Sequence, residues 1–96
     1  MKPAKVQTMT REEIDQHLQN IGQSALLMDG FDEACIGFSQ RIGEPLLAVY
    51  NWQHMVQILK NRDKMSYEDA VEYIEYNCIG AWIGEQTPII VMPIEL

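Results

Sequence analysis

Carboxylates carry most of the side-chain chemistry that this sequence offers. Glu68, Glu72 and Glu75 are spaced i, i+4 and i+7, which places them along one face of a helix, with Asp69 at its edge. Like charges at this spacing repel one another by roughly 0.2–0.5 kcal/mol per pair, so a sequence selected only for helix stability would alternate them with lysines. The acidic stripe (Glu68, Glu72 and Glu75) therefore indicates either an electrostatic docking surface or a plain solvated helix face.

Two tyrosines, Tyr73 and Tyr76, flank the acidic stripe. Tyrosine is common in protein interfaces because it buries a large area at a low cost in side-chain entropy. We therefore expect the stripe and these tyrosines to contact a protein with a basic surface, or a second copy of the chain.

A second group of carboxylates lies around a turn. Asp29, Asp32 and Glu33 are close together in the sequence, which invites a calcium-binding interpretation. Their spacing does not match the alternating oxygen ligands and final glutamate of an EF-hand loop. They are expected to be turn and cap carboxylates, and no metal site is predicted. The alternative is a site for a small molecule or ion built from Asp29, Asp32, Asn77 and Trp82.

Catalytic residues do not fall into a recognisable pattern. His17 and His54 are the only imidazoles, and they do not form a metal-ligand pair. Cys35 and a histidine brought close by folding would make a nucleophile and base, but a cysteine in an apolar strand is usually a core residue. Cys78 lies at the expected end of a helix, also among apolar neighbours. We predict a protein that is not an enzyme and has no cofactor.

Length and charge narrow the function classes further. Ninety-six residues suffice for one domain, expected over residues 10–96 after a flexible tail at 1–9. The formal net charge of −7 and the lack of clustered Lys and Arg argue against nucleic acid as a partner. No run of residues approaches the length of a membrane span, and two cysteines without paired spacing fit reduced thiols. A cytoplasmic protein with no membrane contact is expected.

The elements that must position these side chains begin with an N-terminal helix. Thr10 followed by Glu13 matches a capping box, and Ile14, Leu18 and Ile21 recur on one face of a helix over residues 11–21. Gly22 is suited to end it. This face is thinly apolar, so the helix is expected at the edge of the domain or against a second copy.

Two strands and a reversal follow. Residues 34–41 favour a strand, residues 42–45 contain the Gly and Pro of a turn, and residues 46–50 favour a returning strand. The almost continuous apolarity of 46–50 indicates a central strand.

The second half of the chain predicts two helices and a last strand. Asn51 caps a helix to about residue 61, Ser66 caps a helix from Tyr67 to about Cys78, and residues 89–92 favour a strand. The buried side of the second helix is expected to carry Tyr67, Ala70, Val71, Ile74 and Cys78. The fold class is α+β, with a small, largely antiparallel three-stranded sheet covered on one face by two helices, plus the N-terminal helix.

Several segments together resemble a family of small uncharacterised proteins that are common in bacteriophage and prophage genomes. They are DGFDEACIG at residues 29–37, Tyr50-Asn51 before a helix, MSYEDA at 65–70 and EYNCIGAWIGEQTP at 75–88. The resemblance covers about residues 27–91, and its most specific part is 76–88. It implies a phage or environmental bacterial origin, no assigned activity, and binding to a host protein such as a defence or nucleic-acid enzyme.

Three function classes remain open from the sequence. The first is a non-enzymatic interaction domain that binds a basic partner or itself as a homodimer. The second is a small-molecule or ion-binding domain, and the third is a structural subunit of a homo-oligomer.

Overall fold

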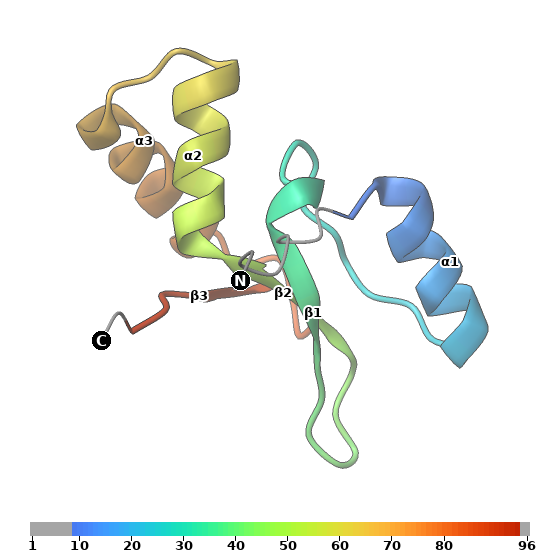
Figure 1. Ribbon diagram of the computed structural model, residues 1–96. Helices are drawn as coiled ribbons and strands as arrows, with labels where there is room; N and C mark the ends of the chain where they lie inside the picture. The colour runs from blue at the N-terminus through green and yellow to red at the C-terminus, as the bar shows by residue number, and fades with distance from the viewer. Residues whose placement is uncertain (1–8, 95–96) are drawn as a thin grey trace.

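A computed structural model of the chain describes residues 9–94, which form an α+β fold (Figure 1). Along the chain the elements are α1 (Arg11–Ile21), the 3₁₀ helix η1 (Asp32–Ala34), β1 (Cys35–Ser39), β2 (Leu47–Asn51), α2 (Trp52–Arg62), α3 (Tyr67–Ile74), the π-helical segment η2 (Glu75–Ile79) and β3 (Ile89–Val91). The predicted α+β class is therefore confirmed. The predicted tail at 1–9 falls almost entirely outside the described residues.

The three strands form a mixed sheet in the order β1-β2-β3, with β2 in the centre as predicted. β1 and β2 pair antiparallel, whereas β2 and β3 pair parallel, with Val49 opposite Ile89 and Asn51 opposite Val91. The prediction of a largely antiparallel sheet is thus wrong for half of the strand pairings. The reason is that α2 and α3 follow β2 directly and carry the chain back before β3 begins, which is the long crossover that parallel strands require.

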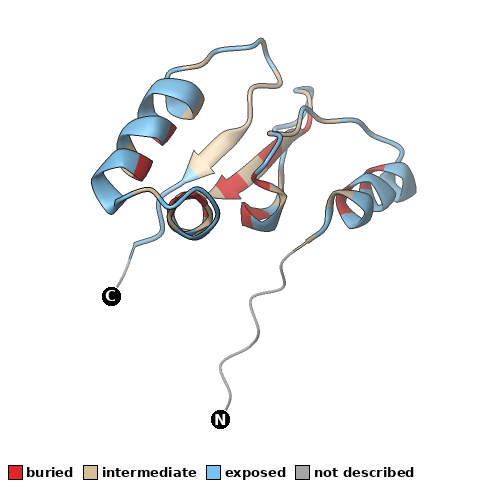
Figure 2. Ribbon diagram, turned by 90° about the horizontal axis from the view of Figure 1, so that it is seen from above, coloured by how far each residue is buried: buried red, intermediate tan, exposed pale blue. Residues whose placement is uncertain are grey.

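The helices lie on two sides of the strands. In both views α2 and α3 lie on one side and α1 on the other, with the strands between them (Figures 1 and 2). The expectation that two helices cover a single face of the sheet remains a prediction. The buried positions of α1 and α3 are on the sides of these helices that face the strands (Figure 2).

α1 is capped and docked as a part of this fold. The Thr10 hydroxyl accepts a hydrogen bond from the Glu13 N–H at 3.2 Å, and the Glu13 carboxylate in turn accepts one from the Thr10 N–H, so the predicted capping box is confirmed. Gly22 ends the helix with a left-handed φ of 67°. Ile14 and Leu18 are buried in the core, and His17 stacks on Phe38 with ring centroids 5.6 Å apart. α1 therefore packs against the rest of its own chain through Ile14, Leu18 and His17.

One apolar cluster joins all of these elements. Its largest fully buried side chains come from α1, β1, β2, α2 and α3, and they are Tyr50, Ile14, Met55, Leu59, Ile74 and Cys35. Met9 and Ile90 pack against the cluster from the two ends of the described chain. The shared core fixes α2 and α3 relative to the sheet and leaves their outer faces to water.

Tyr50 places a polar group at the centre of this core. Its side chain has no exposed surface, and its hydroxyl oxygen accepts a hydrogen bond from the Met28 N–H at 2.8 Å. Burial raises the pKa of Tyr50 from 10 to about 12, because the phenolate would lose its hydration. The folded state consequently holds the Tyr50 proton at a pH where the unfolded chain releases it.

We expect the free energy of unfolding to fall as the pH rises from about 10 to 12, because the unfolded chain then binds fewer protons than the folded one. At about 1.4 kcal/mol per pH unit, the Tyr50 share of this loss is on the order of 3 kcal/mol. The measurement is urea unfolding at about pH 9 and pH 11.5 for the wild type and for Tyr50→Phe. At neutral pH Tyr50→Phe should have a lower free energy of unfolding than the wild type. Its free energy of unfolding should then fall less than that of the wild type as the pH becomes alkaline. Parallel losses in the two proteins would contradict the assignment to Tyr50.

Candidate functional site

The candidate interaction surface is built on α3 and η2. The Ser66 hydroxyl accepts a hydrogen bond from the Asp69 N–H at 3.1 Å, so the predicted N-cap is confirmed. Ala70 and Ile74 are fully buried and hold the inner side of the helix on the core. The helix was expected to continue to about Cys78, and the chain remains helical, but its last five residues wind as a π-helix. Such wide turns are rare and are often found at functional sites.

The three glutamates of the acidic stripe are exposed to water along the outer side of α3 and the start of η2. In the described part of the chain the ion pairs are made by Arg11 and Arg62, and no ion pair reaches the stripe. Its negative charges are therefore uncompensated within residues 9–94. Two of them lie beyond the first turn of α3, where the helix N-terminus no longer offsets them.

Aromatic side chains share a surface hollow with the stripe. The hollow has a volume of about 390 Å³, and its lining consists of Tyr67, Glu68, Val71, Glu72, Glu75 and Tyr76. Tyr76 is 76% exposed, so most of its ring is free to contact a partner. The structure thus brings the stripe and one of its two predicted tyrosines together. Tyr73, at 40% exposure, lies outside the lining of the hollow.

Two residues of the hollow had been assigned to the buried side of the helix. Tyr67 was expected in the core but is 54% exposed, and its ring meets Trp52 edge-on at 6.3 Å between centroids. That prediction is wrong because Tyr67 is the first residue of α3, where its ring lies edge-on to Trp52 but outside the core cluster. Val71 and Cys78 are half-buried. The apolar side of α3 therefore reaches the surface and forms one wall of the hollow.

Large apolar side chains continue along the chain after α3. Ile79, Trp82 and Ile83 are exposed by 48%, 77% and 60%, and of these three only Trp82 was among the predicted site residues. The backbone here is fixed, since the Thr87 hydroxyl accepts from the Ile83 N–H at 2.9 Å and donates to the Gly84 carbonyl at 2.6 Å. The exposed side chains are therefore held on an ordered turn.

The predicted aspartate site is occupied by an arginine of the same chain. The Arg11 guanidinium donates to Asp29 Oδ1 at 2.9 Å and to Asp32 Oδ1 at 3.0 Å. Desolvation is the largest single effect on the Arg11 pKa, and it acts to lower it. The hydrogen bonds to Asp32 and Asp29 act in the opposite direction, and the pKa is raised overall. Asn77 lies on η2, where its side-chain amide donates to the Tyr73 carbonyl at 3.0 Å. Among residues 9–94 no hydrogen bond or ion pair joins Asn77 or Trp82 to either aspartate.

The described residues were also searched for a set of side chains that could bind a metal ion. No group of three or more His, Cys, Asp or Glu side chains within residues 9–94 is placed to hold a metal ion. The two aspartates that lie together are bridged by Arg11, and their charges are thereby compensated.

No protein-family model, no curated protein and no solved structure matches this chain. The resemblance to small phage proteins remains a prediction.

Both cysteines are reduced and sheltered. Desolvation raises the pKa of the Cys35 thiol, which is 2% exposed, and it does the same for the half-buried Cys78. Each is thus held in the thiol form at neutral pH, which is unfavourable for nucleophilic attack. His17 is stacked on Phe38, and His54 lies near the start of α2.

The helices of the described residues were also compared with the requirements for crossing a membrane. Across residues 9–94 no helix combines the length and the apolar character needed to cross a bilayer.

Proposed function

We propose that this chain is a non-enzymatic interaction domain and that the outer face of α3 and η2 binds a protein with a basic surface. One observation carries the proposal: three exposed glutamates without ion pairs in the described chain line a single hollow together with Tyr67 and Tyr76. Complementary charges across an interface steer association and fix its register, and buried tyrosines supply area at the centre.

The exposed side chains after α3 support the same proposal. Tryptophan and tyrosine are the residues most enriched at the energetic centres of interfaces, and Trp82 and Tyr76 are each more than three-quarters exposed. Such side chains gain most when a partner removes them from water. We infer that Trp82 and Tyr76 supply the apolar part of the contact surface and the acidic stripe supplies the charged part.

A different protein is a better partner for this face than a second copy of the chain. A symmetric dimer formed through α3 would bring two acidic stripes together, and like charges placed opposite each other in an interface cost several kcal/mol. A basic partner offsets this charge. In the phage setting implied by the resemblance, that partner would be a host protein in the bacterial cytoplasm.

The proposal is tested by capturing proteins from a bacterial lysate with the immobilised chain at low salt. We expect a discrete partner that is released as salt rises through about 0.1–0.5 M, because the Debye length shortens from about 10 Å to a few Å. The triple variant Glu68→Gln, Glu72→Gln, Glu75→Gln should not capture it.

The matched control removes three charges from exposed carboxylates outside the proposed surface, Glu12→Gln, Asp15→Asn and Glu44→Gln, and should capture the partner as the wild type does. Equal capture by both triple variants, or release that does not depend on salt, would show that the acidic stripe is only a solvated helix face.

A further inference from the structure

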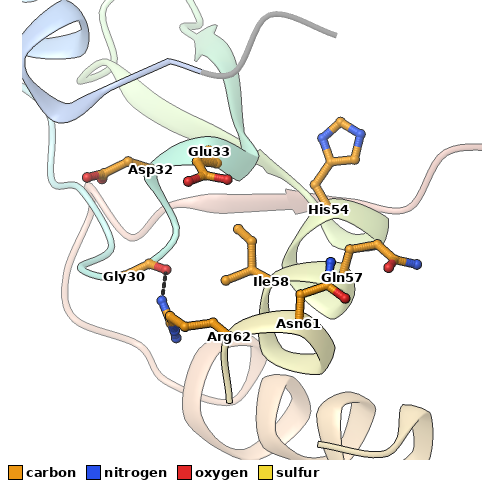
Figure 3. A pocket seen from close by; sticks show the side chains of 8 residues that line it. All are labelled: Gly30, Asp32, Glu33, His54, Gln57, Ile58, Asn61 and Arg62. Atoms are coloured by element: carbon orange, nitrogen blue, oxygen red, sulfur yellow. Dashed lines mark hydrogen bonds between the residues drawn. The ribbon is translucent and has the colours of Figure 1, made fainter. Parts of the chain in front are cut away.

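A second concave site lies away from α3, between η1 and one face of α2 (Figure 3). The pocket has a volume of about 570 Å³. The α2 side is formed by residues from His54 to Arg62 at spacing i, i+3, i+4, i+7 and i+8, with Ile58 in the middle. The opposite wall is formed by Gly30, Asp32 and Glu33. Polar groups thus surround an apolar floor, which is the usual composition of a small-molecule site.

Two arginines hold the η1 wall from opposite sides. Arg11 binds Asp29 and Asp32, and its guanidinium also donates to the Met28 carbonyl at 3.4 Å. Arg62 reaches across from α2 and donates to the Gly30 carbonyl at 2.6 Å (Figure 3). A wall that is fixed before the ligand arrives costs less entropy on binding. The pocket is therefore preorganised.

The ion pairs of the two arginines determine which charged side chains of the pocket remain without an ion-pair partner in the described chain. Asp32 is compensated by Arg11, and Arg62 is compensated by Asp63, whose two carboxylate oxygens each accept a hydrogen bond from it at 3.0 Å. The Arg62 pKa is raised, first by this hydrogen bond with Asp63 and to a smaller degree by the charge of Glu33. Glu33 itself makes no hydrogen bond or ion pair with any residue in the described range. Its carboxylate is exposed and forms no ion pair within residues 9–94, so its oxygens can accept hydrogen bonds from a ligand.

A side-chain amide lies across the floor from Glu33. Figure 3 shows the Glu33 carboxylate on one side of Ile58 and the Asn61 side-chain amide on the other, whereas the Gln57 amide extends away from the pocket. A carboxylate accepts two parallel N–H bonds, and the Asn61 amide oxygen accepts one or two more. A planar group rich in N–H donors fits between these acceptors.

We propose that the pocket between η1 and α2 binds an alkylguanidinium group, with its fork of donors on Glu33 and its alkyl stem on Ile58. Guanidinium matches a carboxylate in bidentate geometry and is more weakly hydrated than an ammonium, so it loses less on entering a pocket. An anion is disfavoured, because Glu33 would repel it and Arg62 is already engaged with Asp63 and Gly30. Two sources carry the group, namely a free small guanidine and an arginine side chain of a peptide.

The test is an NMR titration of the ¹⁵N-labelled full chain with butylguanidinium, and with butylurea as its neutral analogue of the same shape. We expect shifts confined to amides near residues 30–33 and 54–62 with butylguanidinium, and none with butylurea. Glu33→Gln should weaken binding at least about tenfold, because it removes charge-assisted hydrogen bonds. Glu44→Gln, which removes the same charge on the β1–β2 turn, should leave the affinity unchanged.

Further ligands separate the two sources and the competing chemistries. Tighter binding of N-acetylarginine methylamide than of butylguanidinium indicates an arginine side chain of a peptide, and the reverse order indicates a free guanidine. Equal shifts with butylurea, an unchanged affinity in Glu33→Gln, shifts caused by inorganic phosphate in place of the cation, or no shifts up to about 10 mM ligand would each overturn the proposal. The acidic stripe is not involved, so the Glu72→Gln variant should bind butylguanidinium normally whether or not α3 binds a protein.

Discussion

Ile14→Ala is expected to lower the free energy of unfolding by about 2–5 kcal/mol, a large part of the roughly 5–15 kcal/mol that a domain of this kind possesses. Ile14 is fully buried on the inner face of α1, in the same cluster as Tyr50, Met55 and Leu59. Truncation removes the transfer free energy of three carbon atoms and leaves a cavity that the neighbouring elements fill only in part. The loss would be measured by urea denaturation followed by circular dichroism.

The control for this variant is Ile21→Ala, which makes the same change two turns later on the same helix. Ile21 is 42% exposed, so its truncation should cost at most about 1 kcal/mol. The change in helix propensity is the same at both positions, and the difference between the two variants therefore reports the docking of α1. Small and equal losses of unfolding free energy in the two variants would mean that α1 does not share the core. A loss at Ile14 that depends on protein concentration would mean the same, because α1 would then pack on a second copy of the chain.

Local sequence signals predicted the elements because each signal acts within a few residues. The Thr10–Glu13 capping box and the Ser66 cap hydrogen-bond to N–H groups three residues away, and both appear where they were expected. The central position of β2 was predicted from its apolar run, because a strand covered on both faces of the sheet carries apolar side chains on both. These features need no knowledge of how distant segments meet.

The strand directions and the pockets depend on distant segments, and there the sequence alone was insufficient. The parallel pairing of β3 follows from the length and course of the α2–α3 crossover, which the pattern of apolar residues does not encode. The ion pairs of Arg11 join residues 18 and 21 positions apart, so the sequence showed two acidic turn residues without the cation that neutralises them. The pocket beside Glu33 arises in the same way, from η1 and a face of α2 brought together by folding.

The candidate surface on α3 was predictable only in part, because helical spacing is a local signal and the covering of the helix is not. Helical spacing placed the acidic stripe on one outer face, and the structure has all three glutamates exposed. Tyr67 and Val71 were missed as surface residues, because their spacing from Ile74 marks them as apolar positions whether or not a neighbour covers them. Which end of an apolar stripe stays uncovered depends on where α2 crosses it.

Reversing two charges of the stripe, with Glu72→Lys and Glu75→Lys together, is expected to reduce the affinity for the basic partner at least about a hundredfold. Each substitution replaces an attraction with a repulsion, and unfavourable charge placement of this kind costs several kcal/mol across an interface. The melting temperature should not fall, because both side chains are exposed and neither forms an ion pair within residues 9–94. Relief of the repulsion between Glu68 and Glu72 adds roughly 0.2–0.5 kcal/mol of helix stability. Calorimetric titration with the captured partner and thermal unfolding by circular dichroism measure the two effects separately.

The matched control is Asp15→Lys with Glu44→Lys, which changes the net charge by the same amount at exposed positions on α1 and on the β1–β2 turn. Long-range attraction depends on net charge and should weaken equally in both double variants, mainly through the association rate. Only the α3 variant places lysines against the partner's basic groups, so only it should lose affinity through faster dissociation. If both double variants bind equally, the partner senses the acidity of the whole protein, and the hollow between Tyr67 and Tyr76 is not its docking site.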